Sequence, residues 1–145
     1  MRIWHRELLP YLPDAQFRGQ LRELVAIMHE WRDSGKTNHV LINKVMDFPK
    51  SHLSSYFTIY SCEFSYRYRK EVSERISQEF REFGGETHVI HPFSPDWHDR
   101  VYLDICMMNL FEKHVYGSGS SRITDMEWEK LEGGYKRITG RYFLV

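Results

Sequence analysis

The sequence has little of what several specialised protein classes need. Only two of its 145 residues are cysteine and five are proline. Two cysteines are too few for a disulfide scaffold, so we expect reduced thiols and a cytoplasmic protein. No apolar run approaches the ~18 residues that span a bilayer, and the start of the chain shows no hydrophobic signal stretch, so we expect no membrane partner. No repeat or low-complexity tract is present, which argues against a disordered chain.

The chain also lacks net charge. It holds 20 Lys and Arg against 20 Asp and Glu, which argues against a nucleic-acid binder that depends on charge over its whole surface. The charges are not spread evenly, because the chain from Gly133 onward contains Lys136, Arg137 and Arg141 but no acidic residue. Local basic surfaces are therefore expected on a neutral whole.

What the chain does have is apolar and aromatic content. Hydrophobic residues make up 41% of it, and it carries 4 Trp, 9 Tyr and 9 Phe. At this length we expect one domain, residues 1–145, with a substantial core.

Apolar residues recur mainly at helical spacing. Phe17, Leu21, Leu24, Met28 and Trp31 follow three- and four-residue steps, as in an amphipathic helix. The same analysis, with Pro, Gly and capping signals as boundaries, predicts an all-α fold of three main helices and a short fourth one. The expected helices span residues 14–34, 49–84, 94–116 and 124–134, the segment before the first is expected to be non-helical, and residues 135–145 are expected to form a basic aromatic tail.

Three patterns that are typical of functional sites have simpler explanations here. Histidines and aspartates gather around a predicted loop and helix start but show no zinc-site spacing, so surface and capping roles are favoured over a metal. The alternation of aromatic and basic residues over 66–70 is typical of single-strand binders, yet on a helix these side chains point in all directions. Cys106 falls on an apolar helix face and is expected in the core. The histidines and aspartates are His88, His91, His98, Asp96 and Asp99.

The first expected helix also carries Arg18, Arg22 and Glu23 beside its apolar stripe, and there a family resemblance begins. Residues 12–24, Leu-Pro-Asp-Ala-Gln-Phe-Arg-Gly-Gln-Leu-Arg-Glu-Leu, resemble the opening helix of the phage-type pyrimidine-dimer DNA glycosylase/AP lyase family, whose core motif is Arg-Glu-Leu. The start Met-Arg-Ile is similar to the family's Thr-Arg-Ile, and Tyr135-Lys136 followed by Gly140-Arg141 is similar to its C-terminal motif.

The resemblance implies a mechanism without metal or cofactor. The family's nucleophile is the α-amine of the first residue, here Met1, because the bulk of Arg2 should prevent removal of the methionine. The amine attacks C1′ of the sugar and forms a Schiff base, and β-elimination then cuts the strand. The carboxylate that assists is matched by Glu23. The DNA contacts that the resemblance and the basic surfaces imply are Arg2, Arg18, Arg22, Tyr135, Lys136 and Arg141.

The resemblance therefore implies a DNA repair enzyme that acts as a monomer on damaged double-stranded DNA, in the cytoplasm or on the nucleoid. The alternative is a helical module that shares the fold but binds nucleic acid or a protein partner without catalysis. A third reading is a structural helical protein that binds no nucleic acid. Trapping of a Schiff base on abasic DNA distinguishes the first from the others.

Overall fold

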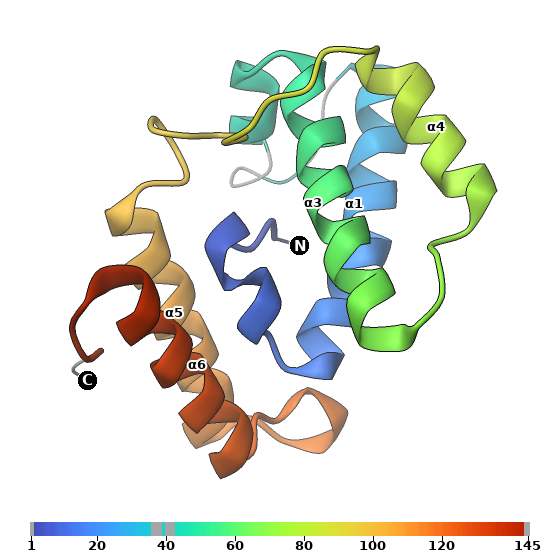
Figure 1. Cartoon of the computed structure of the whole chain (residues 1–145). Helices are drawn as coiled ribbons and strands as arrows, with labels where there is room; N and C mark the ends of the chain where they lie inside the picture. Colours follow the sequence, from blue (N-terminus) through green and yellow to red (C-terminus); the bar gives the residue numbers. More distant parts are fainter. Residues whose placement is uncertain (1, 36–38, 40–42, 144–145) are drawn as a thin grey trace.

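The fold is all-α, as the sequence predicts (Figure 1). The computed structural model describes residues 2–35, 39 and 43–143, and this part of the chain contains no β-strand. Met1, the predicted nucleophile, lies outside the described residues. The helices of the described part of the chain are η1 (Arg6–Tyr11), α1 (Asp14–Ser34), η2 (Lys44–Asp47), α3 (Lys50–Tyr68), α4 (Glu74–Gly84), α5 (Arg100–Tyr116), η3 (Gly119–Ser121) and α6 (Asp125–Thr139), where η marks a 3₁₀ helix.

Helix α1 has the predicted bounds. It begins after Pro13, whose fixed φ suits a helix start, and Asp14 places a negative charge in the first turn. It ends at Gly35, where φ is +72° and the backbone N–H donates to the Trp31 carbonyl at 3.0 Å. A residue with a side chain adopts that φ at a cost, so glycine is the residue that ends the helix cleanly.

The single helix predicted over 49–84 is wrong, because the chain breaks it into α3 and α4. Arg69 takes a left-handed conformation with φ of 55°, and the Ser73 hydroxyl then caps α4 by accepting from the Ile76 N–H at 3.3 Å. The break lets α4 fold back on α3, where Phe57 and Phe80 stack with centroids 4.1 Å apart. The apolar spacing continues through the turn, which is why it resembled one helix.

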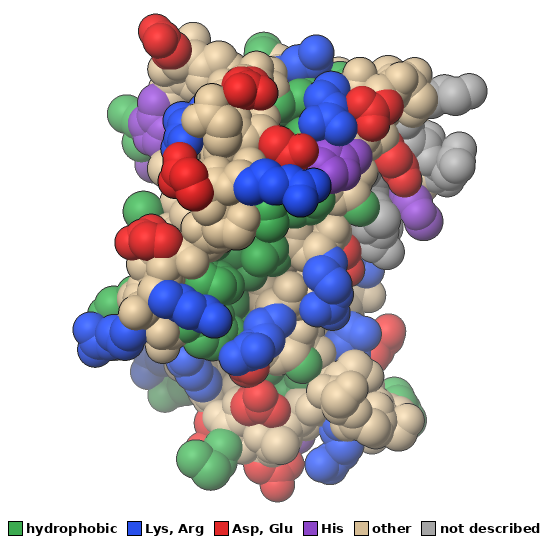
Figure 2. All heavy atoms as spheres, turned by 90° about the vertical axis from the view of Figure 1, so that its right-hand side faces the viewer, with side chains coloured by type: hydrophobic (Ala, Val, Ile, Leu, Met, Phe, Trp, Pro, Cys, Tyr) green, Lys and Arg blue, Asp and Glu red, His purple; other side chains and the backbone are tan. Residues whose placement is uncertain are grey.

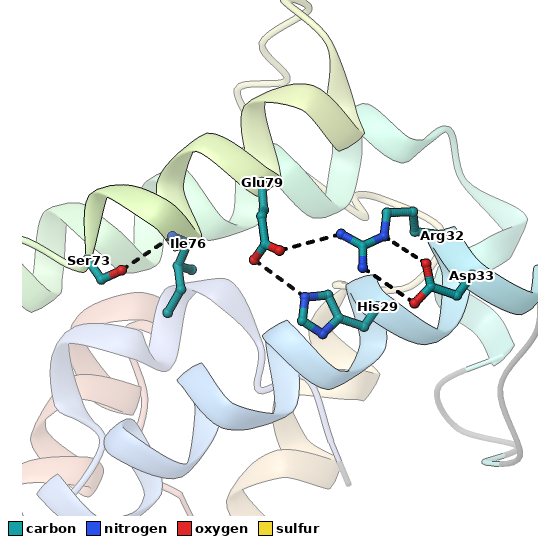
Figure 3. Close-up of polar contacts among 6 residues, drawn as sticks. All are labelled: His29, Arg32, Asp33, Ser73, Ile76 and Glu79. Carbon is teal, nitrogen blue, oxygen red and sulfur yellow. Dashed lines mark hydrogen bonds and ion pairs between the residues drawn. The ribbon is translucent and has the colours of Figure 1, made fainter.

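Helix α4 is also fastened to α1. Glu79 accepts from His29 at 3.4 Å and pairs with Arg32 at 3.5 Å, while Arg32 also bonds Asp33 at 2.8 Å (Figure 3). The three helices α1, α3 and α4 therefore form one layer of the molecule.

The two C-terminal helices differ from prediction at one end each. Helix α5 begins at Arg100 rather than near Pro95, because Asp99 caps it by accepting from the Tyr102 N–H at 2.8 Å. Helix α6 has the predicted capping box at Thr124 but runs through Gly133 and Gly134 to Thr139, so the predicted end was wrong. Gly134 serves close packing: a Cβ there would lie 2.3 Å from the Tyr11 ring.

The N-terminal segment lies in the middle of the molecule. In Figure 1 it runs between the layer of α1, α3 and α4 and the pair α5 and α6. Ile3, Leu8 and Leu9 are fully buried, and η1 packs on both α3 and α6. The segment before α1 was predicted to be non-helical. That prediction was wrong, because Arg6–Tyr11 forms the 3₁₀ helix η1, which includes Pro10. Within the described residues, no helix is long and apolar enough to cross a membrane.

Candidate active site

Side chains from three helices hold the backbone of residues 2–4. Gln20 on α1 donates to the Arg2 carbonyl at 2.7 Å and accepts from the Trp4 N–H at 2.7 Å, as a neighbouring strand would. The Tyr56 hydroxyl donates to the Trp4 carbonyl at 2.6 Å, and the Tyr102 hydroxyl donates to the Ile3 carbonyl at 2.5 Å. These contacts satisfy buried backbone groups that otherwise cost free energy.

The two tyrosines are reliable donors because they are buried. Burial raises the pKa of Tyr56 and of Tyr102 well above the ordinary value of a phenol. Both hydroxyls therefore keep their protons at any physiological pH. The position of the N-terminal segment is fixed by α1, α3 and α5 together.

Glu23 lies one helical turn beyond Gln20, on the same face of α1. Its Oε2 accepts from the Arg2 N–H at 2.8 Å. The other oxygen, Oε1, has no hydrogen-bond partner among the described residues. Glu23 thus contacts the backbone of the residue that follows Met1, while Met1 itself lies outside the described residues.

Glu23 opens onto a groove of about 520 Å³. One wall comes from the N-terminal segment and α1, and the other from the last two turns of α5 and the segment after it. The residues that line it are Arg2, Trp4, Glu23, Asn109, Glu112, Lys113, Tyr116, Gly117, Ser118 and Ser121. A larger groove of about 590 Å³ lies between α3 and α4 and is rich in serine and threonine, but it contains none of the predicted site residues.

The predicted cations of the N-terminal half lie in three different settings. Arg2 lines the groove with its guanidinium 5.1 Å from the Trp4 ring centroid. Arg22 is exposed and forms no ion pair within the described part of the chain. Arg18 is exposed but pairs with Asp14 at 2.9 Å, which offsets its charge. Figure 2 shows that Lys and Arg side chains flank a strip of hydrophobic surface on the α4 side, so charge is unevenly distributed on the neutral protein.

The C-terminal residues lie at the other end of α5. Tyr135 is 2% exposed, and its hydroxyl accepts from Arg100 at 2.9 Å and donates to Asp104 at 2.8 Å. Arg100 and Asp104 belong to the first turns of α5. The groove adjoins the last turns of α5, about 15 Å further along the helix. Lys136 and Arg141 are exposed, and neither of them lines the groove.

The histidines do not gather at a metal site in the structure. His98 is 2% exposed, stacks on His5 and accepts from the Arg6 N–H at 3.1 Å. Asp99 caps α5 and His88 lines the other groove. Within the described residues no three His, Cys, Asp or Glu are placed to hold a metal ion. That the reaction needs none stays a prediction.

Neither cysteine lines the groove at Glu23. Cys106 is fully buried, as predicted, and burial raises the pKa of its thiol to about 11, which keeps it protonated. Cys62 lines the larger groove between α3 and α4.

Sequence reasoning did not identify Gln20, Tyr56 or Tyr102. One signal was present: Gln20 is a polar residue inside the apolar stripe between Phe17 and Leu24. A buried amide needs partners, and here they are backbone groups of the N-terminal segment.

One comparison with known proteins is decisive for the family. A family model described as pyrimidine dimer DNA glycosylase matches residues 1–74, half of the chain. The chain belongs to this family. It is therefore a DNA repair glycosylase by family, and its substrate class is damaged DNA. No curated protein and no solved structure matches it.

The family match divides the groove. The N-terminal segment, Gln20, Glu23, Arg18 and Arg22 all lie within the matched residues. The α5 wall and the tail lie beyond them, so the glycosylase family match does not extend to the C-terminal part of the resemblance. The groove thus joins residues inside the matched range to residues outside it.

Proposed function

We propose that the protein removes a damaged pyrimidine and then cuts the strand, with the α-amine of Met1 as nucleophile. The amine attacks C1′ of the sugar, the bond from C1′ to the base breaks, and the base leaves with a proton. The C1′–O4′ bond then breaks and O4′ takes up a proton, so the sugar ring opens and an iminium forms between the amine nitrogen and C1′. Removal of a C2′ proton then expels the 3′ phosphate by β-elimination.

The observation that carries this proposal is the contact between Glu23 and the Arg2 N–H at 2.8 Å. The α-amine is joined to that nitrogen through only two carbon atoms, so the two nitrogens lie within ~3.7 Å of each other. A carboxylate anchored on the neighbouring peptide is within reach to move the protons of the reaction and to stabilise the cationic imine.

The chemistry favours an α-amine over a lysine. A free α-amine has a pKa of ~7.7–8.0 against ~10.4 for lysine, so a far larger fraction is neutral and nucleophilic near pH 7. The groove also contains Lys113, which is the competing amine that a test must separate from Met1.

The cations take the role of phosphate contacts in this proposal. Arg2 at the groove and the exposed Arg22 and Arg18 flank the reacting strand, while Lys136 and Arg141 hold a more distant phosphate. Tyr135 is buried, so we assign it no direct contact with DNA.

Borohydride trapping on a duplex with one abasic site tests the mechanism. The untagged protein should form a covalent adduct, and peptide mapping should place it on the N-terminal residue. N-terminal acetylation should abolish the adduct, whereas Lys113→Ala should retain it. An adduct on Lys113, or full trapping by the acetylated protein, contradicts the proposed nucleophile. Binding without any adduct favours the non-catalytic module.

A further inference from the structure

The turn between α3 and α4 has no role in the function proposed above. Arg67, near the end of α3, makes contacts inside the protein: its guanidinium donates to Glu63 at 2.9 Å and to the Leu9 carbonyl at 2.9 Å. Tyr68 also points inward, because its hydroxyl donates to Asp14 at the start of α1. These contacts hold the turn beside the first turns of α1.

The three cations that follow have exposed side chains. Arg69 and Lys70 in the turn and Arg75 in the first turn of α4 form no ion pair within the described residues. Arg69 has a φ of 55°, a left-handed conformation that glycine adopts at lower cost than arginine. Its guanidinium lies 6.0 Å from the ring centroid of Tyr66, which is exposed as well. The charges of this turn are therefore free to attract an anionic partner.

Helices α4 and α1 run side by side in the same direction. Glu79 of α4 contacts His29 of α1 at 3.4 Å (Figure 3). Further along both helices, the rings of Phe83 and Trp31 pack with centroids 5.2 Å apart. Arg75 precedes Glu79 by one turn on the same face of α4, so it lies beside the part of α1 that precedes His29.

That part of α1 continues the basic surface. It carries the exposed Arg22 and, one turn earlier, Arg18, whose guanidinium lies 4.7 Å from the Tyr68 ring centroid. Arg18 thus connects α1 with the turn between α3 and α4. Figure 2 shows Lys and Arg side chains on both sides of a hydrophobic strip on this side of the molecule.

The acidic residues of this region do not balance its cations. Asp14 pairs with Arg18 at 2.9 Å, and Glu74 pairs with Arg81. Glu71 is exposed and forms no ion pair among the described residues. One such acid therefore lies among four cations without ion pairs, which we call the α1–α4 basic surface: Arg22, Arg69, Lys70 and Arg75.

We propose that the α1–α4 basic surface binds phosphates of duplex DNA on one side of the lesion. The surface begins at Arg22, which the proposed function already assigns to a phosphate, so one bound duplex can contact both the surface and the groove at Glu23. Asp14, against which Tyr68 holds the turn, precedes Glu23 by ~13.5 Å along α1. At ~3.4 Å per base pair, the phosphates at the turn lie about four base pairs from the lesion. This inference rests on the DNA substrate of the proposed function but not on its nucleophile.

The salt dependence of binding to three duplexes tests the surface. Each duplex carries a tetrahydrofuran abasic analogue, which fixes the position of the lesion and forms no Schiff base. The long duplex has about ten base pairs on each side of the lesion, and the other two are shortened to about two base pairs on one side or on the other. Only one of the shortened duplexes lacks the phosphates that the turn would bind.

The test variant combines Arg69→Gly, Lys70→Gln and Arg75→Gln. Glycine suits the left-handed conformation at position 69, so the turn is kept while its charge is lost. Each phosphate contact contributes about −0.9 to the slope of log K against log[salt], so the variant should make the slope on the long duplex shallower by about two to three units. The same change should appear on one shortened duplex and be absent from the other.

A matched control variant removes three positive charges elsewhere. It combines Arg32→Gln and Arg81→Gln, at two arginines that already form ion pairs, with Lys130→Gln on the exposed side of α6. Its slope should stay within about half a unit of that of the unsubstituted protein on every duplex, since no phosphate contact is lost. Arg75→Gln alone leaves the turn unaltered and should change the slope on the long duplex by about one unit.

The outcomes separate this inference from the proposed mechanism. An unchanged slope on the long duplex overturns the surface. An equal change on both shortened duplexes also overturns it, because the cations then act through the overall field of the protein and not on phosphates at one side of the lesion. If the unsubstituted protein is never trapped by borohydride on abasic DNA but the slopes differ as expected, the amine mechanism fails and the α1–α4 basic surface is supported. Trapping with unchanged slopes supports the mechanism and overturns the surface.

Discussion

At the scale of single residues, Glu23 and Gln20 contact the N-terminal segment from one face of α1 and have different roles. Gln20 fixes the backbone of residues 2–4 through two hydrogen bonds of 2.7 Å. Glu23 accepts from the Arg2 N–H through Oε2, and its Oε1 has no hydrogen-bond partner among the described residues. The motif that contains Glu23 could be found in the sequence. The partners that give the motif its geometry could not, because Tyr56 and Tyr102 are distant in the chain.

Glu23→Gln is the sharpest variant for the role of the carboxylate. The amide oxygen can still accept from the Arg2 N–H, so the geometry is kept while the charge is lost. We expect cleavage of abasic DNA to fall by ~10²-fold or more in single-turnover assays, the scale of a positioned acid–base group. The melting temperature should change little, and Glu129→Gln on the exposed side of α6 should retain activity. Full activity of Glu23→Gln would make Glu23 an ordinary surface residue.

Two buried tyrosines on α3 test whether the position of the N-terminal segment matters for the reaction. The Tyr56 hydroxyl donates to Trp4, whereas the Tyr60 hydroxyl donates to the Phe17 carbonyl inside α1 at 2.8 Å. Phenylalanine at either position should lower the free energy of unfolding by about 1–3 kcal/mol, with Tyr60 at the lower end because Phe17 remains in its helix.

Only Tyr56→Phe should slow the rate of borohydride trapping, because only it releases the segment that carries the amine. Chemical denaturation and trapping kinetics on the same preparations give both quantities. Equal trapping rates for the two folded variants would show that the hydrogen bond stabilises the fold without positioning the nucleophile.

At the scale of helices, most predicted boundaries are confirmed, and each missed boundary has its own cause. The capping box at Thr124 and the proline before Asp14 are local signals that the structure confirms. The turn at Arg69 was missed because no glycine or proline marks it, and the left-handed residue there is an arginine. The glycine pair at 133–134 was misread as a helix end because glycine has two uses, a backbone conformation and close packing.

The two adjacent glycines of α6 should respond oppositely to alanine. A Cβ at Gly133 meets no atom within 4 Å, whereas a Cβ at Gly134 would lie 2.3 Å from the Tyr11 ring. We expect Gly133→Ala to raise the free energy of unfolding by about 0.5–1 kcal/mol through helix propensity, and Gly134→Ala to lower it by about 1–3 kcal/mol through overpacking. Urea unfolding of both variants checks this, and a stabilising Gly134→Ala would mean that η1 and α6 pack less closely.

At the scale of the whole molecule, the buried histidines link stability to pH. His5 and His98 stack in the core near Arg6 and Asp99, and burial, followed by the positive charge of Arg6, lowers the pKa of His5 to about 4. Burial also lowers the pKa of His98. Both are neutral in the folded protein at pH 7, whereas an unfolded histidine takes up a proton near pH 6.5.

The folded state should therefore lose stability as the pH falls from about 6.5 towards 4. The unfolded chain binds protons in that window and the folded chain does not, so His5 alone accounts for about 3 kcal/mol. Denaturation between pH 4 and pH 8 should show a shallower pH dependence for His5→Asn, whose amide oxygen can still accept from the Glu7 N–H as the His5 ring does. An unchanged slope would mean that other groups set the acid sensitivity.

The neutral net charge sets how the molecule meets DNA. Besides Arg69, Lys70 and Arg75, six cations are available for phosphates, namely Arg2, Arg18, Arg22, Lys136, Arg137 and Arg141. Full use of all six would give a slope of about −5 for log K against log[salt]. Because Asp14 already pairs with Arg18, we expect a shallower slope and weak nonspecific binding, with Kd of ~10⁻⁴–10⁻⁶ M at physiological salt.

Variants that each remove one positive charge test the predicted salt dependence of DNA binding. Arg22→Ala should reduce the slope by about one unit, and Arg141→Ala should do so only if the tail contacts DNA. Deleting residues 135–145 is not a clean test, because it removes the buried Tyr135. Arg32→Ala, which loses an arginine already paired with Asp33 and Glu79, serves as the control. A slope that none of these variants changes would place the DNA on another face.

The sequence by itself determined the helical class, the first helix with both its ends, the capping of α6 and the motif that carries Glu23. These features depend on neighbours three or four residues apart, and such neighbours can be read along the chain. Only the tertiary structure decided that α3 turns back as α4, that Gln20 and two tyrosines hold the N-terminal segment, and that α5 closes the groove with Tyr116. Each of these depends on residues far apart in the chain, which come together only when the helices bury their apolar faces against one another.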